Sequence, residues 1–308
     1  METDKWNPGL DAHPAQCCLA LLFFRGKLQM RRKSVINPVL VERLRQLHDK
    51  ILAAARKQTG QIVEKLSRLP HGLVLIGGPT GSGKTTTLAA LVDVINRRDA
   101  KHIVTIEDPI EYEHSHHKSV VEQVEIGIDA PDFPTALRSA VRQSPDVIVV
   151  GEMRDPETMR IALAAGETGH LVFSTLHTGD VTSTISRVAD SFPLERQATI
   201  RQELSMALAA VMTQILLPRA GGGRIPAAEM LMVGYSARQH VRKNALQHLH
   251  QEITITRRQG SFSFEESLAQ LVSRGLINIE EARARSTHRE ELDGLLRSGN
   301  ATQAGEAT

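Results

Sequence analysis

The first part of the chain places apolar residues at helical spacing. Asn37 and Pro38 supply a helix N-cap and a first-turn proline. The apolar positions that follow are Leu40, Leu44, Leu47 and Ile51. This pattern predicts one amphipathic helix over residues 37–58 and a second, shorter helix over residues 61–69 that ends at Pro70. Residues 1–33 show little periodicity and predict no particular fold.

From residue 72 to about residue 178, short apolar runs alternate with helical segments. This order predicts an α/β domain with a mostly parallel sheet and helices on both faces. The predicted strands are 73–76, 103–106, 147–150 and 171–175, and the predicted helices are 85–96, 135–143 and 156–165. Ligands of such sheets bind outside the carboxyl ends of the strands, so polar residues that follow a strand are the first candidates for a site.

After this alternation the chain becomes mainly helical. A glycine turn at 221–223 precedes a predicted strand at 224–233, which we place at the far edge of the sheet. Helical patterns follow and end near Leu296. The chain therefore divides into a poorly specified segment, a helical remnant or linker, an α/β core, a helical C-terminal part and a disordered tail, over residues 1–33, 34–69, 70–233, 234–296 and 297–308.

Composition limits the possible partners. Hydrophobic residues make up 41% of the 308 residues, enough to fill a core, and the net charge is only +2. The small charge and the 3% aromatic content disfavour a nucleic-acid-binding surface. The two cysteines, Cys17 and Cys18, are adjacent, so they form neither a disulfide framework nor a zinc site, which fits the cytoplasm. The apolar run at 17–24 is too short for a transmembrane segment, and we expect none.

The strongest candidate chemistry is the sequence GPTGSGKT, which lies between a predicted strand and a predicted helix. This spacing is that of a phosphate-binding loop, in which glycines let successive backbone N–H groups point at phosphate oxygens. The helix adds its positive N-terminus. Lys84 can then reach the β- and γ-phosphates, and the Thr85 hydroxyl can bind Mg²⁺. The predicted ATP-binding residues are Gly78, Pro79, Thr80, Gly81, Ser82, Gly83, Lys84, Thr85 and Thr86.

Acidic residues follow two of the predicted strands. Glu107 and Glu111 lie just past the second strand, where carboxylates can activate water or hold Mg²⁺. A solvated acidic turn is an equal alternative for this stretch. Glu152 follows the third strand, the usual position of a further carboxylate that handles Mg²⁺, although Gly151 stands where an Asp normally precedes it.

Histidines occupy both ends of the predicted strand at 171–175. His170 precedes the strand and His177 follows it. A neutral imidazole at the carboxyl end can donate to a γ-phosphate and sense its loss, whereas lone histidines are more often structural. Three further histidines share one polar loop without other ligands and predict a solvated turn rather than a metal site: His114, His116 and His117.

These clusters, in this order after the phosphate loop, resemble the secretion ATPase superfamily, in particular its type IV pilus retraction (twitching-motility) ATPases. In that family TIEDPIE (105–111) is an aspartate box, GEMRD (151–155) is an atypical Walker B ending, and AAGETGHLVFSTLHT (164–178) is a histidine box. SARQHVRK (236–243) is similar to a degraded form of the family's AIRNLIRE motif, with an ordinary basic helix as the alternative. The resemblance runs from about Gln61 to Leu296 and implies a RecA-like P-loop NTPase core.

The resemblance also implies roles for individual residues. Glu111 would polarise the attacking water, and Glu152 would organise Mg²⁺ through its coordination shell. His177 would read the γ-phosphate, and His170 would support its strand or help to couple subunits. The implied protein is a homo-hexameric cytoplasmic motor that drives an inner-membrane pilus platform protein.

Two alternatives remain. A pilus extension or type II secretion ATPase is disfavoured, because those relatives carry a tetracysteine zinc module and this chain has no cysteine after Cys18. The other alternative is a nucleotide-binding ring component that hydrolyses ATP weakly or not at all. In the family a PAS-like domain precedes the core and lends arginines to the neighbouring subunit, and Lys84 lies too early for a complete one. We therefore expect weak hydrolysis, a labile ring and stimulation by full-length related subunits.

Overall fold

The computed structural model describes residues 60–305. The predicted helix over residues 37–58 and the segment 1–33 lie outside these residues. The described chain begins in a helix over residues 60–66, shorter than the predicted 61–69, and then enters the sheet. No helix in this part of the chain is both long and apolar enough to cross a membrane.

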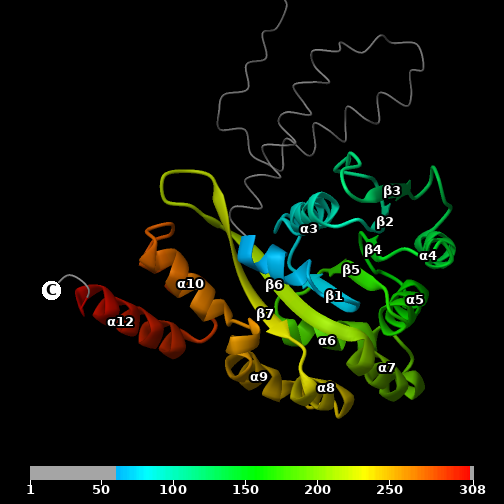
Figure 1. The fold of residues 1–308 in the computed structure, drawn as a ribbon. Helices are drawn as coiled ribbons and strands as arrows, with labels where there is room; N and C mark the ends of the chain where they lie inside the picture. Colours follow the sequence, from blue (N-terminus) through cyan, green and yellow to red (C-terminus); the bar gives the residue numbers. More distant parts are fainter. Residues whose placement is uncertain (1–59, 306–308) are drawn as a thin grey trace, which may run out of the picture.

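Within the described residues, seven strands form one sheet in the order β3-β2-β4-β5-β1-β6-β7 (Figure 1). Neighbouring strands are parallel, except that β7 runs antiparallel to β6 at one edge. The α/β class and the mostly parallel sheet are therefore confirmed. In chain order the strands are β1 (Gly72–Gly77), β2 (His102–Glu107), β3 (Val120–Glu125), β4 (Val147–Val150), β5 (Leu171–Leu176), β6 (Leu208–Pro218) and β7 (Arg224–Met232).

Both faces of the sheet are covered, because alternate residues of each central strand point to opposite faces. Leu73 and Leu75 of β1 pack in one core cluster, and Val74 and Ile76 pack in another. The second cluster includes the 60–66 helix and α3, and the first includes four helices on the other face. These helices are α3 (Lys84–Arg98) on one side and α4 (Phe133–Val141), α5 (Pro156–Glu167), α6 (Val181–Asp190) and α7 (Leu194–Ala207) on the other.

The C-terminal helices gather beside β6 and β7, away from β3 (Figure 1). Helices α8 and α9 extend the first core cluster through side chains such as Val241 and Leu249. Helices α10 to α12 instead build a separate cluster on the outer ends of β6 and β7, which includes Leu268 and Leu292. Their bounds are α8 (Tyr235–Arg242), α9 (Leu249–Ile255), α10 (Phe264–Ser273), α11 (Ile279–Arg285) and α12 (Arg289–Gly305), with short 3₁₀ turns at Leu246–His248 and Arg257–Gln259.

The structure corrects the sequence prediction at three places. Strands β3 and β6 were not predicted, and α12 runs to Gly305 instead of ending near Leu296. The segment 297–308 was predicted to be disordered, but its first part contains no proline and includes helix-favouring Ala and Gln. The strand predicted at 224–233 is confirmed as the edge strand β7.

The core lies on both faces of the sheet, so shortening a buried side chain of a central strand should strongly reduce the free energy of unfolding. Ile148 in β4 is fully buried, so Ile148→Ala should cost about 2–5 kcal/mol in unfolding free energy. Ile128 is 53% exposed, and Ile128→Ala should stay within about 0.5 kcal/mol of the parent. Urea denaturation of both variants measures the difference. Equal shifts of the two midpoints would contradict this assignment of the core.

Candidate nucleotide-binding and catalytic site

The loop after β1 turns sharply because three of its glycines adopt backbone angles that other residues avoid. The φ angles are 149° at Gly78, 76° at Gly81 and 89° at Gly83. At Gly78 space is also lacking, since an added Cβ would lie 2.5 Å from the carbonyl oxygen of Gln214 and would collide with the Ser82 hydroxyl. The loop conformation therefore requires glycine for two independent reasons.

Gln214 in β6 holds this loop in place through two side-chain hydrogen bonds. The Gln214 side chain donates to the carbonyl oxygen of Ser82 at 2.7 Å and accepts from the Thr87 hydroxyl at 2.9 Å. Gln214 is only 2% exposed, so these hydrogen bonds are shielded from water. They fix the loop to both the sheet and the first turn of α3.

Lys84, at the first position of α3, is a buried cation inside the loop. Its side chain curls back, and Nζ donates to the carbonyl oxygens of Gly78 at 2.8 Å and Pro79 at 3.0 Å. Burial lowers the pKa of Lys84, while the negative charges of Glu152 and Glu111 oppose that shift. The ammonium group thus lies between the loop backbone and two carboxylates.

A cleft of about 440 Å³ opens above the loop at the carboxyl ends of the strands. Its lining includes residues from the segments that follow β1, β2, β4 and β5, together with residues of α3, β6 and β7. It brings together, from the predicted site, Thr80, Gly81, Gly83, Lys84, Thr85, Thr86, Glu111, Glu152 and His177. The remaining loop residues, Gly78, Pro79 and Ser82, shape the turn beneath it.

Glu111 lies beside the first turn of α3 in this cleft. Burial raises the pKa of Glu111, although a hydrogen bond with the Thr85 side chain and the positive charge of Lys84 act in the opposite direction. The neighbouring Tyr112 is buried and its hydroxyl hydrogen-bonds with that of Thr86 at 3.0 Å. Glu111 is therefore held beside the loop rather than exposed in a solvated turn.

Glu152 and His177 form a second polar group in the lining of the cleft. Glu152 lies 2.8 Å from Arg154 and 3.2 Å from Nε2 of His177. Burial acts to raise the pKa of Glu152, but Arg154 and His177 together hold it below its usual value, so this carboxylate stays ionised. Nδ1 of His177 lies 3.5 Å from the Thr80 hydroxyl, which links the pair to the phosphate loop.

His170 does not join this group. It lies at the amino end of β5, where its carbonyl oxygen accepts from Gly72 at the start of β1 and its Nδ1 lies 3.2 Å from the carbonyl oxygen of Ala165. The carboxyl end of β5, which carries His177, is the end at the cleft. His170 therefore lies away from the cleft, and its contacts fit the expected role of supporting the strand.

Three other side chains at the site were not singled out from the sequence. Gln214 lies in a strand that was not predicted. Tyr112 directly follows TIEDPIE and Arg154 lies in GEMRD, where the acidic residues gave the stronger signal. His114, interpreted as part of a solvated turn, lines the cleft. Oxygen donors from Thr85, Glu111 and Glu152 at one cleft suit a hard cation such as Mg²⁺.

A glycine-rich loop between a central parallel strand and a helix, with a buried lysine and facing carboxylates, defines a P-loop nucleotide-binding protein. The chain belongs to the type II/IV secretion system protein family, whose model matches residues 39–302.

Individual relatives agree with this assignment. The chain is 44% identical over 242 residues to the type IV pilus retraction ATPase PilT of Pseudomonas aeruginosa, covering 79% of this chain and 70% of the relative. It is 42% identical to a twitching motility protein of Neisseria gonorrhoeae, covering 79% of this chain and 65% of the relative. The crystal structure of the pilus retraction motor PilT with bound ADP superposes with a TM-score of 0.69 at 45% identity, covering 76% of this chain and 66% of that one. The chain thus spans about two thirds of the length of these relatives.

The strained loop predicts a sharp difference between two glycines. Gly78→Ala should abolish tight binding of a fluorescent ADP analogue, because the methyl group meets Gln214 and φ is 149°. Gly179, just after β5, has nothing within 4 Å of an added Cβ, so Gly179→Ala should bind like the parent. Fluorescence anisotropy measures both affinities. Parent-like affinity of Gly78→Ala would contradict the role of this turn.

Proposed function

We propose that this chain is an ATP-hydrolysing motor subunit of the pilus retraction type. The observation that carries the proposal is the convergence of Lys84, Thr85, Glu111, Glu152 and His177 at one cleft, from the loops after four different strands. Its similarity to a pilus retraction ATPase and a twitching motility protein supports the same class of work.

Lys84 and the loop backbone bind the triphosphate in this proposal. The carbonyl oxygens of Gly78 and Pro79 now occupy the hydrogen bonds of the ammonium group. ATP phosphate oxygens carry full charge, so they form stronger hydrogen bonds with a buried cation and replace those neutral acceptors. The Thr85 hydroxyl and Glu152 are the groups that would hold Mg²⁺, which neutralises phosphate charge when bound.

Glu111 accepts the proton of the attacking water. Its raised pKa makes it a better base than an exposed glutamate while Lys84 and Thr85 limit that shift. The carboxylate lies beside the helix turn that binds the phosphates in this proposal, so it is placed to orient a water toward the transferring phosphoryl group. Thr85 links this base to the Mg²⁺-binding position.

His177 reports the state of the γ-phosphate. It bridges Thr80 of the phosphate loop and Glu152, so a phosphate that moves Thr80 also changes the contact with Glu152. Loss of the γ-phosphate would thereby reach β5 and the helices that follow it. This coupling is what a motor requires.

The assembled machine in this proposal is a homo-hexameric ring in the cytoplasm, held at the inner membrane by a pilus platform protein. A weakly or non-hydrolysing regulatory ring component is the competing function.

Two substitutions separate binding from hydrolysis. Lys84→Ala should weaken ATP binding about 10- to 100-fold because the buried charge contacts phosphate in the ground state. Glu111→Gln should bind ATP like the parent and lose about 10²–10⁴-fold in turnover, because the base acts only as the bond breaks. Calorimetric binding and steady-state phosphate release measure the two effects.

The matched control is Glu113→Gln, since Glu113 is exposed on the same segment. It should keep both binding and turnover. If the parent and Glu111→Gln both bind ATP but release phosphate only at the background rate, the ATPase proposal is wrong. The regulatory ring component would then be the favoured function.

His177→Ala should retain ATP binding and lose about 10²-fold in turnover, because a positioned donor near the phosphates is removed. His170→Gln alters the other end of the same strand and should keep its turnover, since His170 lies away from the cleft. Single-turnover phosphate release measures both variants. Full activity of His177→Ala would return this histidine to a purely structural role.

A further inference from the structure

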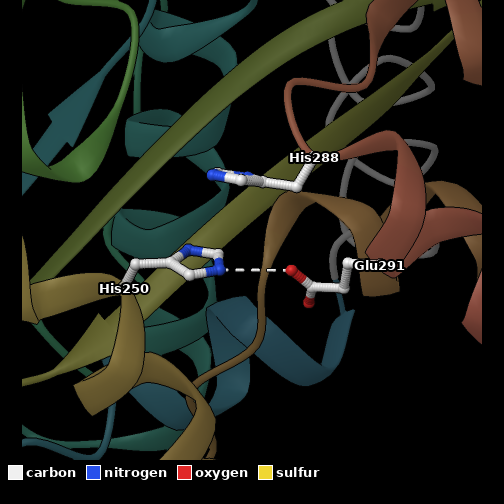
Figure 2. A group of neighbouring side chains, drawn as sticks. All are labelled: His250, His288 and Glu291. Carbon is white, nitrogen blue, oxygen red and sulfur yellow. Dashed lines mark hydrogen bonds and ion pairs between the residues drawn. The ribbon is translucent and has the colours of Figure 1, made fainter.

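We propose that His250, His288 and Glu291 form a binding site for a divalent transition-metal ion of the Zn²⁺ class. One donor atom from each of these side chains lies within 4.8 Å of the other two (Figure 2). The site lies in the C-terminal helical part, and its argument is independent of the proposed ATPase function.

The fold brings the three side chains together from helices that belong to two different hydrophobic clusters. His250 follows Leu249, which is fully buried in the core cluster that α8 and α9 share with the sheet. Glu291 precedes Leu292, which is fully buried in the cluster of α10 to α12. The His250–Glu291 contact therefore joins the two hydrophobic clusters at a point where both backbones are anchored.

Neighbouring residues help to orient two of the donor side chains, those of Glu291 and His288. Ser263 donates to one oxygen of Glu291 at 2.8 Å, which leaves the other oxygen facing His250 at 3.1 Å. Nδ1 of His288 lies 3.2 Å from the Thr287 hydroxyl and 3.7 Å from the buried carboxylate of Glu265, which accepts from the Thr287 hydroxyl at 3.2 Å and from the backbone N–H of His288 at 3.0 Å. A carboxylate behind a ligating histidine is the usual support of a metal site, because it orients the ring and leaves Nε2 for the ion.

The spacing needs only a small adjustment to close on an ion. Four-coordinate Zn²⁺ binds nitrogen and oxygen at about 2.0–2.2 Å, which places donors about 3.4 Å apart. The His250–Glu291 pair already lies at 3.1 Å. The His288 side chain is 53% exposed and its ring stacks on that of His250 at 4.4 Å, so it can rotate toward the pair without crossing the core.

The donor set selects the class of ion. Two imidazole nitrogens and one carboxylate oxygen suit Zn²⁺ and neighbouring transition metals, whereas Mg²⁺ and Ca²⁺ prefer oxygen ligands throughout. Three protein ligands leave the fourth position to water. An ion bound here would clamp α9 to the start of α12 and so fix the α10–α12 cluster against the body that carries the nucleotide cleft.

Metal binding to the full-length chain tests the site. The protein is dialysed against buffered Zn²⁺ with excess Mg²⁺ and without nucleotide, and its zinc content is measured for the parent, Glu291→Gln and His288→Gln. We expect the parent to retain one Zn²⁺ more per chain than either variant, with affinity at least about 10-fold higher. Zn²⁺ should also raise the melting temperature of the parent and not that of the variants.

The matched control is His248→Gln, because the His248 ring lies against that of His240 at a tilt and His248 is not one of the three ligands. It should retain zinc like the parent. Co²⁺ gives a readout that does not depend on stability, since a four-coordinate site produces intense visible absorption. Equal zinc content in the parent and Glu291→Gln, or a cobalt spectrum of six-coordinate type, would overturn the proposal and leave a hydrogen-bonded His–Glu pair.

Discussion

The rest of the site depends on the contacts of the buried ammonium group of Lys84. This group is held by two loop carbonyl groups and faces two carboxylates, and it is only 8% exposed. A cation in this position stabilises the curled loop without a ligand and offers a ready exchange of partners when phosphate arrives. The glycines, Gln214 and the first turn of α3 all serve to keep that cation in place.

The sheet explains why the other polar groups meet there. Strands β2, β4, β5 and β1 are mutually parallel, so their carboxyl ends share one edge and their following loops converge. Glu111, Glu152 and His177 each belong to one of these loops. On the far side of β1, strands β6 and β7 carry the C-terminal helices, where the metal site proposed above joins the two core clusters.

Much of this arrangement could be predicted from local sequence, and the reasons for the failures are physical. Strands β1, β2, β4 and β5 are compact apolar runs, and the phosphate loop has a specific spacing. Strand β6 continues helix α7 with helix-favouring Ala, Leu and Met, and only its pairing with β1 and β7 decides its state. Gln214 lies in β6, so its role was missed together with that strand. His250 and Glu291 are 41 residues apart, so their meeting depends on tertiary packing that no local pattern reveals.

A crystal structure of the chain with Mg²⁺ and a non-hydrolysable ATP analogue would show whether Lys84 exchanges its partners when nucleotide binds. We expect Lys84 Nζ to leave the carbonyl oxygens of Gly78 and Pro79 and to contact the β- and γ-phosphates. We also expect the Thr85 hydroxyl to turn from Glu111 to Mg²⁺, with a water held by Glu111 near the γ-phosphate. A bound analogue that leaves the Lys84 and Thr85 hydrogen bonds unchanged would contradict the account.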